Sequence, residues 1–233
     1  MPYLLSDELA FPNPRDAWED NNGLIAVGGD LQPERLILAY QHGIFPWYSD
    51  KDPILWWSPN PRTVLYLDEL KVSRSLAKSI RNKGYEVYLN RDFEAVITAC
   101  AESRKDQEGT WITSEMLDAY LNLHSLGLAH CVSVYHDKTL VGGLYGPSLG
   151  PFFFGESMFS KMTDASKVAL YYLVDYLKSF DFILIDCQLS NPHLTSLGAR
   201  DISRDQFLDI LDKHILVSQQ TNWQPRRLTH SHD

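Results

Sequence analysis

Hydrophobic and polar residues repeat along the chain with two different periods, and from about residue 63 onward these periods alternate. Apolar positions spaced by three and four predict helices, whereas short apolar or alternating runs predict strands. The predicted helices cover residues 71–83, 93–103, 114–125, 165–180 and 204–214. The predicted strands cover residues 63–67, 85–89, 130–136, 140–146, 151–159 and 182–188. This order predicts an α+β fold with a mixed sheet, a central antiparallel meander and helices on both faces.

The segment before residue 63 follows neither period. Five prolines between Pro33 and Pro61 exclude long regular elements there, and residues 33–43 alone have the pattern of a helix. We predict that the rest consists of loops held by packed aromatic rings, including those of Trp47, Trp56 and Trp57. The chain is therefore expected to have a small N-terminal lobe over residues 1–62 and a larger domain over residues 63–233.

Two carboxylates interrupt otherwise apolar predicted strands. Glu156 lies within FFFGESMFS, and Asp186 lies within FILIDCQ, a run typical of a central strand covered on both faces. A buried acid is costly unless it is paired or hydrogen-bonded, so two of them with Gln188 alongside indicate a functional site. The structural alternative is that each carboxylate only braces its strand by accepting backbone hydrogen bonds.

Strand periodicity also predicts which way these side chains point. Because residues two apart share a face, Asp186 and Gln188 are expected to point one way and Cys187 the other. The same rule places positions 154, 156 and 158 on a common face.

Composition narrows the class of protein. With 233 residues, of which 44% are hydrophobic, the chain is long enough to bury a core. The three cysteines are scattered, which predicts a reducing compartment and no structural zinc. No leader-like segment and no apolar run of about 20 residues is present, so we expect a cytoplasmic protein without a membrane span. The net charge of -9 argues against broad, non-specific binding of nucleic acid.

One segment has the opposite charge. Within residues 71–83 there are five cations and no acid, and a helix places Lys71, Arg74, Lys78 and Arg81 on one face. Such a row of cations is either a solvated surface or a binding site for phosphate groups. Loop tryptophans, Trp47 and Trp111 among them, are in turn either packing plugs or platforms for nucleotide bases.

Several common motifs are missing from the sequence. There is no GxxxxGK[ST] or GxGxxG loop to hold ATP or a dinucleotide, and no GxSxG turn for a serine nucleophile. Nothing in the residue pattern therefore calls for a cofactor.

Taken together, the motifs resemble those of the bacterial leucyl/phenylalanyl-tRNA–protein transferase family. The resemblance runs from Asn22 to Arg204 through NGLIAVGGDL, AYQHGIFPWYS, ILWWSPNPR, EGTWIT, LVGGLYG, GESMFS, ASKVAL, LIDCQ and HLTSLGARDISR. It implies a C-terminal domain similar to the N-acetyltransferase (GNAT) superfamily behind a small N-terminal lobe. The acetyl-CoA loop of that superfamily, [QR]xxGx[GA], has no match here, so acetyl-CoA is not expected.

The resemblance also implies an activity and its partners. The enzyme would move Leu or Phe, with Met as a further candidate, from aminoacyl-tRNA to the N-terminal α-amine of proteins that begin with Arg or Lys. The product would be an N-degron, which marks a protein for degradation. No cofactor or metal is implied, because the aminoacyl ester is already activated, and the enzyme is expected to be a monomer.

Residue roles follow from the same resemblance. Trp47 and Trp111 match residues that hold the terminal adenosine, and the basic helix matches the region that meets the acceptor stem. Asp186, Gln188 and Glu156 are the expected catalytic residues, and the resemblance implies that Gln188, assisted by Asp186, takes a proton from the amine. Because a neutral amide is a very poor base, we expect Gln188 instead to orient the amine as a hydrogen-bond acceptor, with Asp186 polarising it. Glu156 is expected to accept a hydrogen bond from the cationic acceptor. The implied side-chain pocket consists of Leu144, Phe153, Met158, Ala169, Leu170, Leu173 and Ile185.

Three other activities are compatible with these residues. A tRNA-dependent aminoacyltransferase of the peptidoglycan-bridge type would use the same donor with a muropeptide acceptor. A small-molecule N-acyltransferase is disfavoured by the missing acetyl-CoA loop. A non-catalytic module that binds tRNA or N-degrons would not need Asp186 and Gln188.

Overall fold

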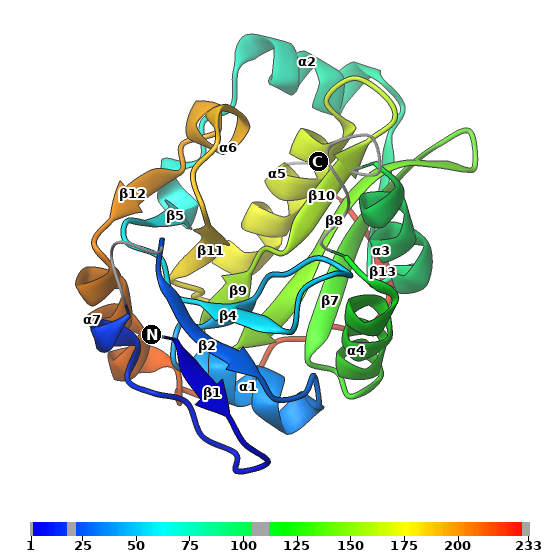
Figure 1. Ribbon diagram of the computed structural model, residues 1–233. Helices are drawn as coiled ribbons and strands as arrows, with labels where there is room; N and C mark the ends of the chain where they lie inside the picture. Colours follow the sequence, from blue (N-terminus) through cyan, green and yellow to red (C-terminus); the bar gives the residue numbers. More distant parts are fainter. Residues whose placement is uncertain (1, 18–21, 104–111, 230–233) are drawn as a thin grey trace.

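The computed structural model describes residues 2–17, 22–103 and 112–229 (Figure 1). Within these residues the larger sheet has nine strands, in the order β12-β5-β11-β9-β8-β7-β6-β13, with β10 paired to β8. The strands are β5 (Arg62–Tyr66), β6 (Glu86–Leu89), β7 (Ala129–His136), β8 (Thr139–Leu149), β9 (Phe152–Phe154), β10 (Ser157–Ser160), β11 (Leu184–Gln188), β12 (Arg200–Ile202) and β13 (Arg226–Leu228). Strands β11 and β9 run parallel, and the other pairs of this sheet are antiparallel. The predicted α+β class with a mixed sheet and a central meander is therefore confirmed.

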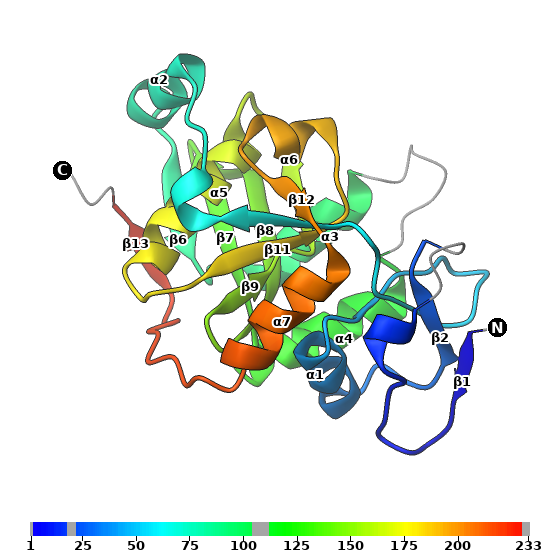
Figure 2. The same ribbon diagram turned by 90° about the vertical axis from the view of Figure 1, so that its left-hand side faces the viewer.

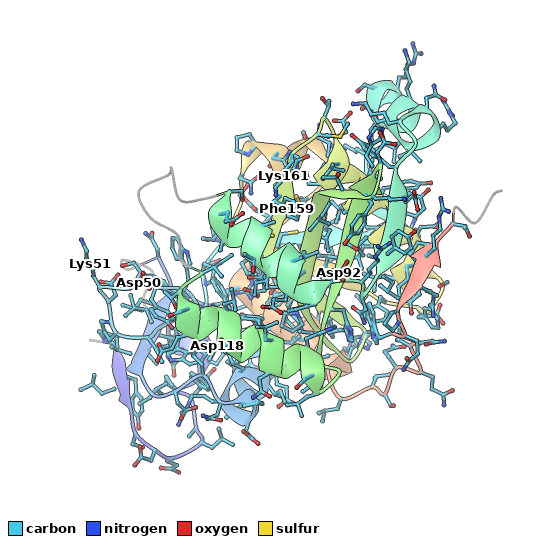
Figure 3. The ribbon with its side chains drawn as sticks, turned by 90° about the vertical axis from the view of Figure 1, so that its right-hand side faces the viewer. Asp50, Lys51, Asp92, Asp118, Phe159 and Lys161 are labelled. Carbon is cyan, nitrogen blue, oxygen red and sulfur yellow. The ribbon has the colours of Figure 1, made fainter. Side chains whose placement is uncertain are left out.

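Helices cover both faces of this sheet. They are α1 (Pro33–Gln41), α2 (Arg74–Asn82), α3 (Phe93–Glu102), α4 (Ser114–Ser125), α5 (Ala165–Lys178), α6 (Pro192–Ser196) and α7 (Arg204–His214). Helix α5 packs on one face, where Leu144, Phe153 and Ile185 share its apolar core. Helices α3 and α4 lie on the opposite face (Figure 3), and the inward residues of α7 pack with Leu184 on that side. Strands β5, β7, β9 and β11 are buried along nearly their whole length because helices cover both faces of the sheet.

Strand β11 occupies the centre of this arrangement, as the apolar run FILIDCQ predicts. It lies between β5 and β9, and all five of its residues are buried. Figure 2 shows β5 and β11 side by side. The end of β11 therefore carries Asp186 and Gln188 into the interior of the molecule.

The N-terminal segment is more regular than predicted. Its described residues form a four-stranded sheet, β1-β2-β4-β3, from β1 (Tyr3–Leu5), β2 (Leu24–Gly28), β3 (Phe45–Pro46) and β4 (Leu55–Trp57). Trp56 and Trp57 thus lie in a strand, and Trp47 directly follows one. The loop prediction was wrong because these strands are too short to show a period, and their pairing joins residues 30 positions apart. Since Ala17, Leu36 and Trp56 share a core with α3 and α4, the boundary at residue 62 stays a prediction.

Several smaller predictions also need correction. The strand predicted over residues 151–159 is two strands, β9 and β10, separated by Gly155 and Glu156. The loop predicted after β11 contains α6 and β12, and β13 near the C-terminus was not predicted. Helix α2 begins at Arg74 because Ser73 caps it, accepting a hydrogen bond from the Leu76 amide at 3.1 Å. Lys71 therefore precedes the helix instead of lying on it.

Candidate active site

The break between β9 and β10 determines where Glu156 lies. The Gly155 amide donates to the Asp186 carbonyl oxygen at 2.9 Å, and the Glu156 amide donates to the Tyr145 carbonyl oxygen at 3.0 Å. Gly146 permits this crossing, since a Cβ at that position would lie 1.7 Å from the Phe154 carbonyl oxygen. The chain thus turns at Glu156, so positions 154, 156 and 158 do not form the continuous strand face that the sequence predicts.

Glu156 is buried in a network of hydrogen bonds. Its Oε1 accepts from the Tyr40 hydroxyl at 2.7 Å and from Gln188 Nε2 at 3.1 Å. The hydroxyl groups of Tyr40 and Tyr120 are also hydrogen-bonded to each other. Burial raises the pKa of Glu156 to about 7, although the hydrogen bonds from the two tyrosines oppose this shift. This carboxyl group can therefore exchange a proton near neutral pH.

The two tyrosines around Glu156 remain protonated. Burial, followed by the nearby charge of Glu156, raises the pKa of Tyr40 and Tyr120 well above the ordinary value. Both hydroxyl groups are consequently hydrogen-bond donors at neutral pH. They come from α1 and α4, so two helices far apart in the sequence meet at Glu156.

Asp186 lies in a different environment on the same strand as Gln188. Its two carboxylate oxygens accept from Arg62, at 2.8 Å from Nε and 2.6 Å from Nη2, and both side chains are buried. Arg62 Nη1 also donates to the Gly43 carbonyl oxygen at 3.0 Å. Asp186 is thus the buried partner of a cation that also binds the N-terminal segment.

The predicted alternation at the end of β11 is wrong. The pairing register of β11 with β5 shifts between Asp186 and Gln188, and Gln188 has a φ of 58°. At this bulge the backbone amide of Gln188 donates a hydrogen bond to Asp186 Oδ1 at 3.0 Å. As a result Cys187 and Gln188 line the same cavity, whereas Asp186 is not among its lining residues. Sequence periodicity could not predict a bulge that depends on β5.

This cavity, which we call the main cavity, has a volume of about 490 Å³. Trp47, Glu156 and Gln188 line it, together with most of the predicted side-chain pocket. The pocket residues that line it are Leu144, Phe153, Met158, Leu170, Leu173 and Ile185. The exception, Ala169, is buried in the core behind the wall. The main cavity therefore joins apolar walls to a carboxylate and an amide.

Other predicted residues lie elsewhere. Trp111 is outside the described residues. Arg74, Lys78 and Arg81 are exposed on α2, and within the described part of the chain none of them forms an ion pair. Helix α2 is fixed beside the start of α5 by a hydrogen bond of 2.8 Å from Ser79 Oγ to Asp164 Oδ2. Its cations therefore form a basic surface next to the helix that carries Leu170 and Leu173.

Three residues of the network were not among the candidates from the sequence. Tyr40 and Tyr120 have the periodicity of ordinary helix residues, and Arg62 has that of a loop end. Each joins the network only through a partner more than 30 positions away in the chain. No local signal in the sequence marks them.

The comparisons with known proteins identify the family of this chain. The family model described as leucyl/phenylalanyl-tRNA protein transferase matches residues 64–212, and the model of its N-terminal domain matches residues 29–60. The chain belongs to this family. It is 54% identical to a leucyl/phenylalanyl-tRNA–protein transferase of Pseudomonas putida (strain W619) over 96% of this chain and 99% of that one. It is 55% identical to a Pseudomonas aeruginosa protein of the same name over 92% and 95% of the two chains.

Solved structures resemble this fold only in part. The L-PGS structure from Bacillus licheniformis is 14% identical, with a TM-score of 0.42 over 74% of this chain and 56% of that one. A tandem GNAT protein from the clavulanic acid biosynthesis pathway is also 14% identical, with a TM-score of 0.34 over 76% and 60% of the two chains. Similarity at these scores supports no functional conclusion.

Family membership confirms the predicted enzyme class, an aminoacyltransferase. Among the helices of residues 2–17, 22–103 and 112–229, none has the length and apolar character needed to cross a membrane.

Proposed function

We propose that this chain transfers Leu or Phe from aminoacyl-tRNA to the N-terminal α-amine of proteins that begin with Arg or Lys. The observation that carries the proposal is the contact between Glu156 and Gln188 at the wall of the main cavity. The apolar part of the cavity suits the side chain of the transferred residue, which gains burial there. The polar pair suits the reacting amine and ester.

The reaction requires position and the removal of two protons from the α-ammonium group. After the first proton has left, the amine nitrogen attacks the ester carbonyl and the C–N bond forms. The C–O bond to the ribose then breaks, and the second proton of the nitrogen passes to the departing ribose oxygen. Glu156 binds the α-ammonium group and accepts its proton, because its pKa of about 7 lies near that of an α-amine at roughly 8. Its negative charge also favours a cationic first residue on the acceptor.

Gln188 and Asp186 support this step in different ways. The side-chain oxygen of Gln188, Oε1, accepts a hydrogen bond from the incoming amine, while Nε2 of the same side chain donates to Glu156. Asp186 acts on the backbone of Gln188, because its carboxylate accepts from the Gln188 amide and is otherwise occupied by Arg62. We therefore assign Asp186 a positioning role in place of the polarising role predicted from the sequence.

The remaining parts of the proposal concern tRNA and the product. Trp47 supports the terminal adenosine at the entrance of the main cavity, and Arg74 and Lys78 neutralise phosphates of the acceptor stem. The aminoacylated protein carries an N-degron. One chain supplies all these groups, so the active form is a monomer, which sedimentation velocity would test.

The test uses labelled Leu-tRNA and Phe-tRNA with peptides that differ only in the first residue. Transfer to peptides that begin with Arg and Lys, and none to the peptide that begins with Ala, is expected. Equal transfer to all three peptides would contradict the acceptor specificity. If none of the three peptides receives Leu or Phe, the proposed function is contradicted.

A further inference from the structure

The C-terminal segment, residues 215–228, runs from the end of α7 to the edge of the larger sheet, where β13 pairs with β6 (Figure 2). Its start packs directly on the turn between β8 and β9, because a Cβ at Gly150 would lie 2.5 Å from the Ile215 carbonyl oxygen. The segment is therefore fixed at both ends, and its first contact lies beside the strand that carries Phe153.

Hydrogen bonds also hold the middle of the C-terminal segment, at Trp223. Asn90 Nδ2 donates to the Trp223 carbonyl oxygen at 2.6 Å, and the Tyr176 hydroxyl donates to the Asn222 carbonyl oxygen at 2.5 Å. Asn90 in turn accepts from the Cys131 amide at 2.9 Å, which joins the segment to β7. The backbone at Trp223 thus has a defined position, and so does the start of its side chain.

The indole ring of Trp223 packs among four buried rings. It stacks on His130, with centroids 3.8 Å apart, and meets the Tyr176 ring at 5.3 Å. The centroids of Phe182 and Phe153 each lie 6.3 Å away, the first edge-on and the second tilted by 36°. Since such an interior is close-packed, the indole occupies space into which its neighbours would otherwise move.

Phe153 connects this cluster of rings to the main cavity. It is 1% exposed and lines the cavity together with Leu144 and Ile185, whereas Trp223 is not among the lining residues. The indole therefore contacts Phe153 from behind the cavity wall. A shift of the Phe153 ring toward Trp223 would deepen the cavity.

We propose that Trp223 is a positioning residue that sets the depth of the main cavity by holding Phe153 in place, and thereby decides how large a donor side chain is accepted. The inference rests on the proposed function, because it concerns the choice of the transferred amino acid. With the indole in place, a side chain that is too large meets a wall that cannot retreat. Without it, the Phe153 ring gains room, and a deeper pocket is filled better by Phe than by Leu.

The test measures the donor preference of Trp223→Ala by competition between labelled Leu-tRNA and Phe-tRNA for one peptide that begins with Arg. We expect the ratio of Phe to Leu transfer to rise about fivefold. Trp-tRNA, whose side chain is larger still, should become a measurable donor. KM for the peptide should stay within about twofold, because Glu156 and Gln188 are held by other contacts.

Phe180→Ala is the matched control. The Phe180 ring contacts Tyr176 in the same core, with centroids 5.0 Å apart, but it does not line the main cavity. This variant should lower the melting temperature, as Trp223→Ala does, and leave the donor ratio unchanged. Because both donors compete for the same enzyme molecules, a smaller folded fraction alone does not change the ratio. Trp223→Phe keeps a smaller ring behind Phe153 and should give an intermediate ratio.

Each result decides the proposal. An unchanged or lower ratio of Phe to Leu in Trp223→Ala would overturn it while transfer itself continues, and so would an equal rise in Phe180→Ala. If Trp223→Ala does not fold, Trp223→Phe decides the question: a rise of about twofold supports the proposal and an unchanged ratio overturns it. No transfer by the wild-type protein would overturn the proposed function, and this inference with it.

Discussion

Arg62 binds both carboxylate oxygens of Asp186, at 2.8 Å and 2.6 Å, with 1% and 0% of the two side chains exposed. The guanidinium group also lies over the rings of Phe45 and Phe207, at 4.9 and 4.6 Å from their centroids. The pair thus ties β5 and β11 to the N-terminal segment and to α7. It also fixes the Asp186 carboxylate, which accepts a hydrogen bond from the backbone amide of Gln188 at 3.0 Å.

Removal of one partner of this pair should destabilise the protein strongly. Arg62→Met leaves the Asp186 carboxylate buried without its cation, which costs about 3–5 kcal/mol of unfolding free energy. The double variant Arg62→Met/Asp186→Leu removes both charges and should recover at least half of that loss. Urea unfolding of the wild type, the single variants and the double variant measures the coupling. Losses that simply add would contradict a coupled pair.

Glu156 should make stability depend on pH. Its pKa is about 7 in the folded protein and 4.5 ordinarily, so between these values the folded state binds more protons than the unfolded state. Stability therefore falls as pH rises from 4.5 to 7, by about 3 kcal/mol. Glu156→Gln does not titrate, so its stability relative to the wild type should rise over this window. A difference in unfolding free energy that is the same at pH 5 and pH 8 would exclude this origin.

The same substitution tests the role of Glu156 in the reaction. Glu156→Gln keeps the size of the side chain but loses the negative charge that binds the α-ammonium group and accepts its proton. KM for the acceptor peptide should rise at least tenfold, with a fall in kcat, while KM for aminoacyl-tRNA stays within twofold. Equal effects on the KM values of both substrates would show that Glu156 only braces the chain between β9 and β10.

The basic surface of α2 should control the salt dependence of tRNA binding. Arg74→Ala/Lys78→Ala removes two exposed cations and should flatten the slope of log Kd against log salt by about 1 to 2. The control Lys213→Ala/Arg227→Ala removes two other exposed cations and should leave the slope unchanged. Filter-binding titrations between 50 and 300 mM salt give both slopes. Identical slopes for the two double variants would assign no tRNA contact to α2.

The donor preference should follow the size of the main cavity. Leu173 is buried and lines it, so Leu173→Phe takes volume from the pocket. Transfer of Phe should fall about tenfold relative to transfer of Leu. Val174→Ile adds volume to the same helix without reaching the cavity lining, and should leave the ratio unchanged. Competition between labelled Leu-tRNA and Phe-tRNA measures the ratio, and an unchanged ratio in Leu173→Phe would place the donor side chain elsewhere.

His130 should make the protein sensitive to acid. Burial lowers its pKa to about 3, its Nδ1 contacts Asn90 Nδ2 at 3.0 Å, and its ring stacks on Trp223 with centroids 3.8 Å apart. In the unfolded state the histidine binds a proton below about pH 6.5, whereas in the folded state it stays neutral. The contribution of neutral His130 to the free energy of unfolding is therefore complete above pH 6.5 and decreases as pH falls toward 3. At pH 4.5 the loss is about 3 kcal/mol. In His130→Asn the unfolding free energy, measured by urea denaturation, should decrease less between pH 7 and pH 4.5 than in the wild type. In the control His42→Gln, which replaces an exposed histidine, it should decrease as much as in the wild type.

The local sequence alone determined the positions of several helices, the central strand β11 and two of the candidate residues. The period of three and four predicted the positions of α3, α4 and α5, because a helix that covers a sheet must present one apolar face. The apolar run of β11 predicted a central strand for the same reason. An acid within such a run is visible in the sequence, so Glu156 and Asp186 were candidates without any structure.

Tertiary structure decided the rest, because it depends on pairing between distant residues. The bulge at Gln188 arises from the register with β5, and the break at Glu156 arises from the crossing beside Gly146. These two irregularities turn the side chains of Gln188 and Glu156 toward each other, while Arg62 binds both carboxylate oxygens of Asp186. Local patterns report which residues are buried, whereas the partners of a buried charge are fixed by how the strands and helices pack.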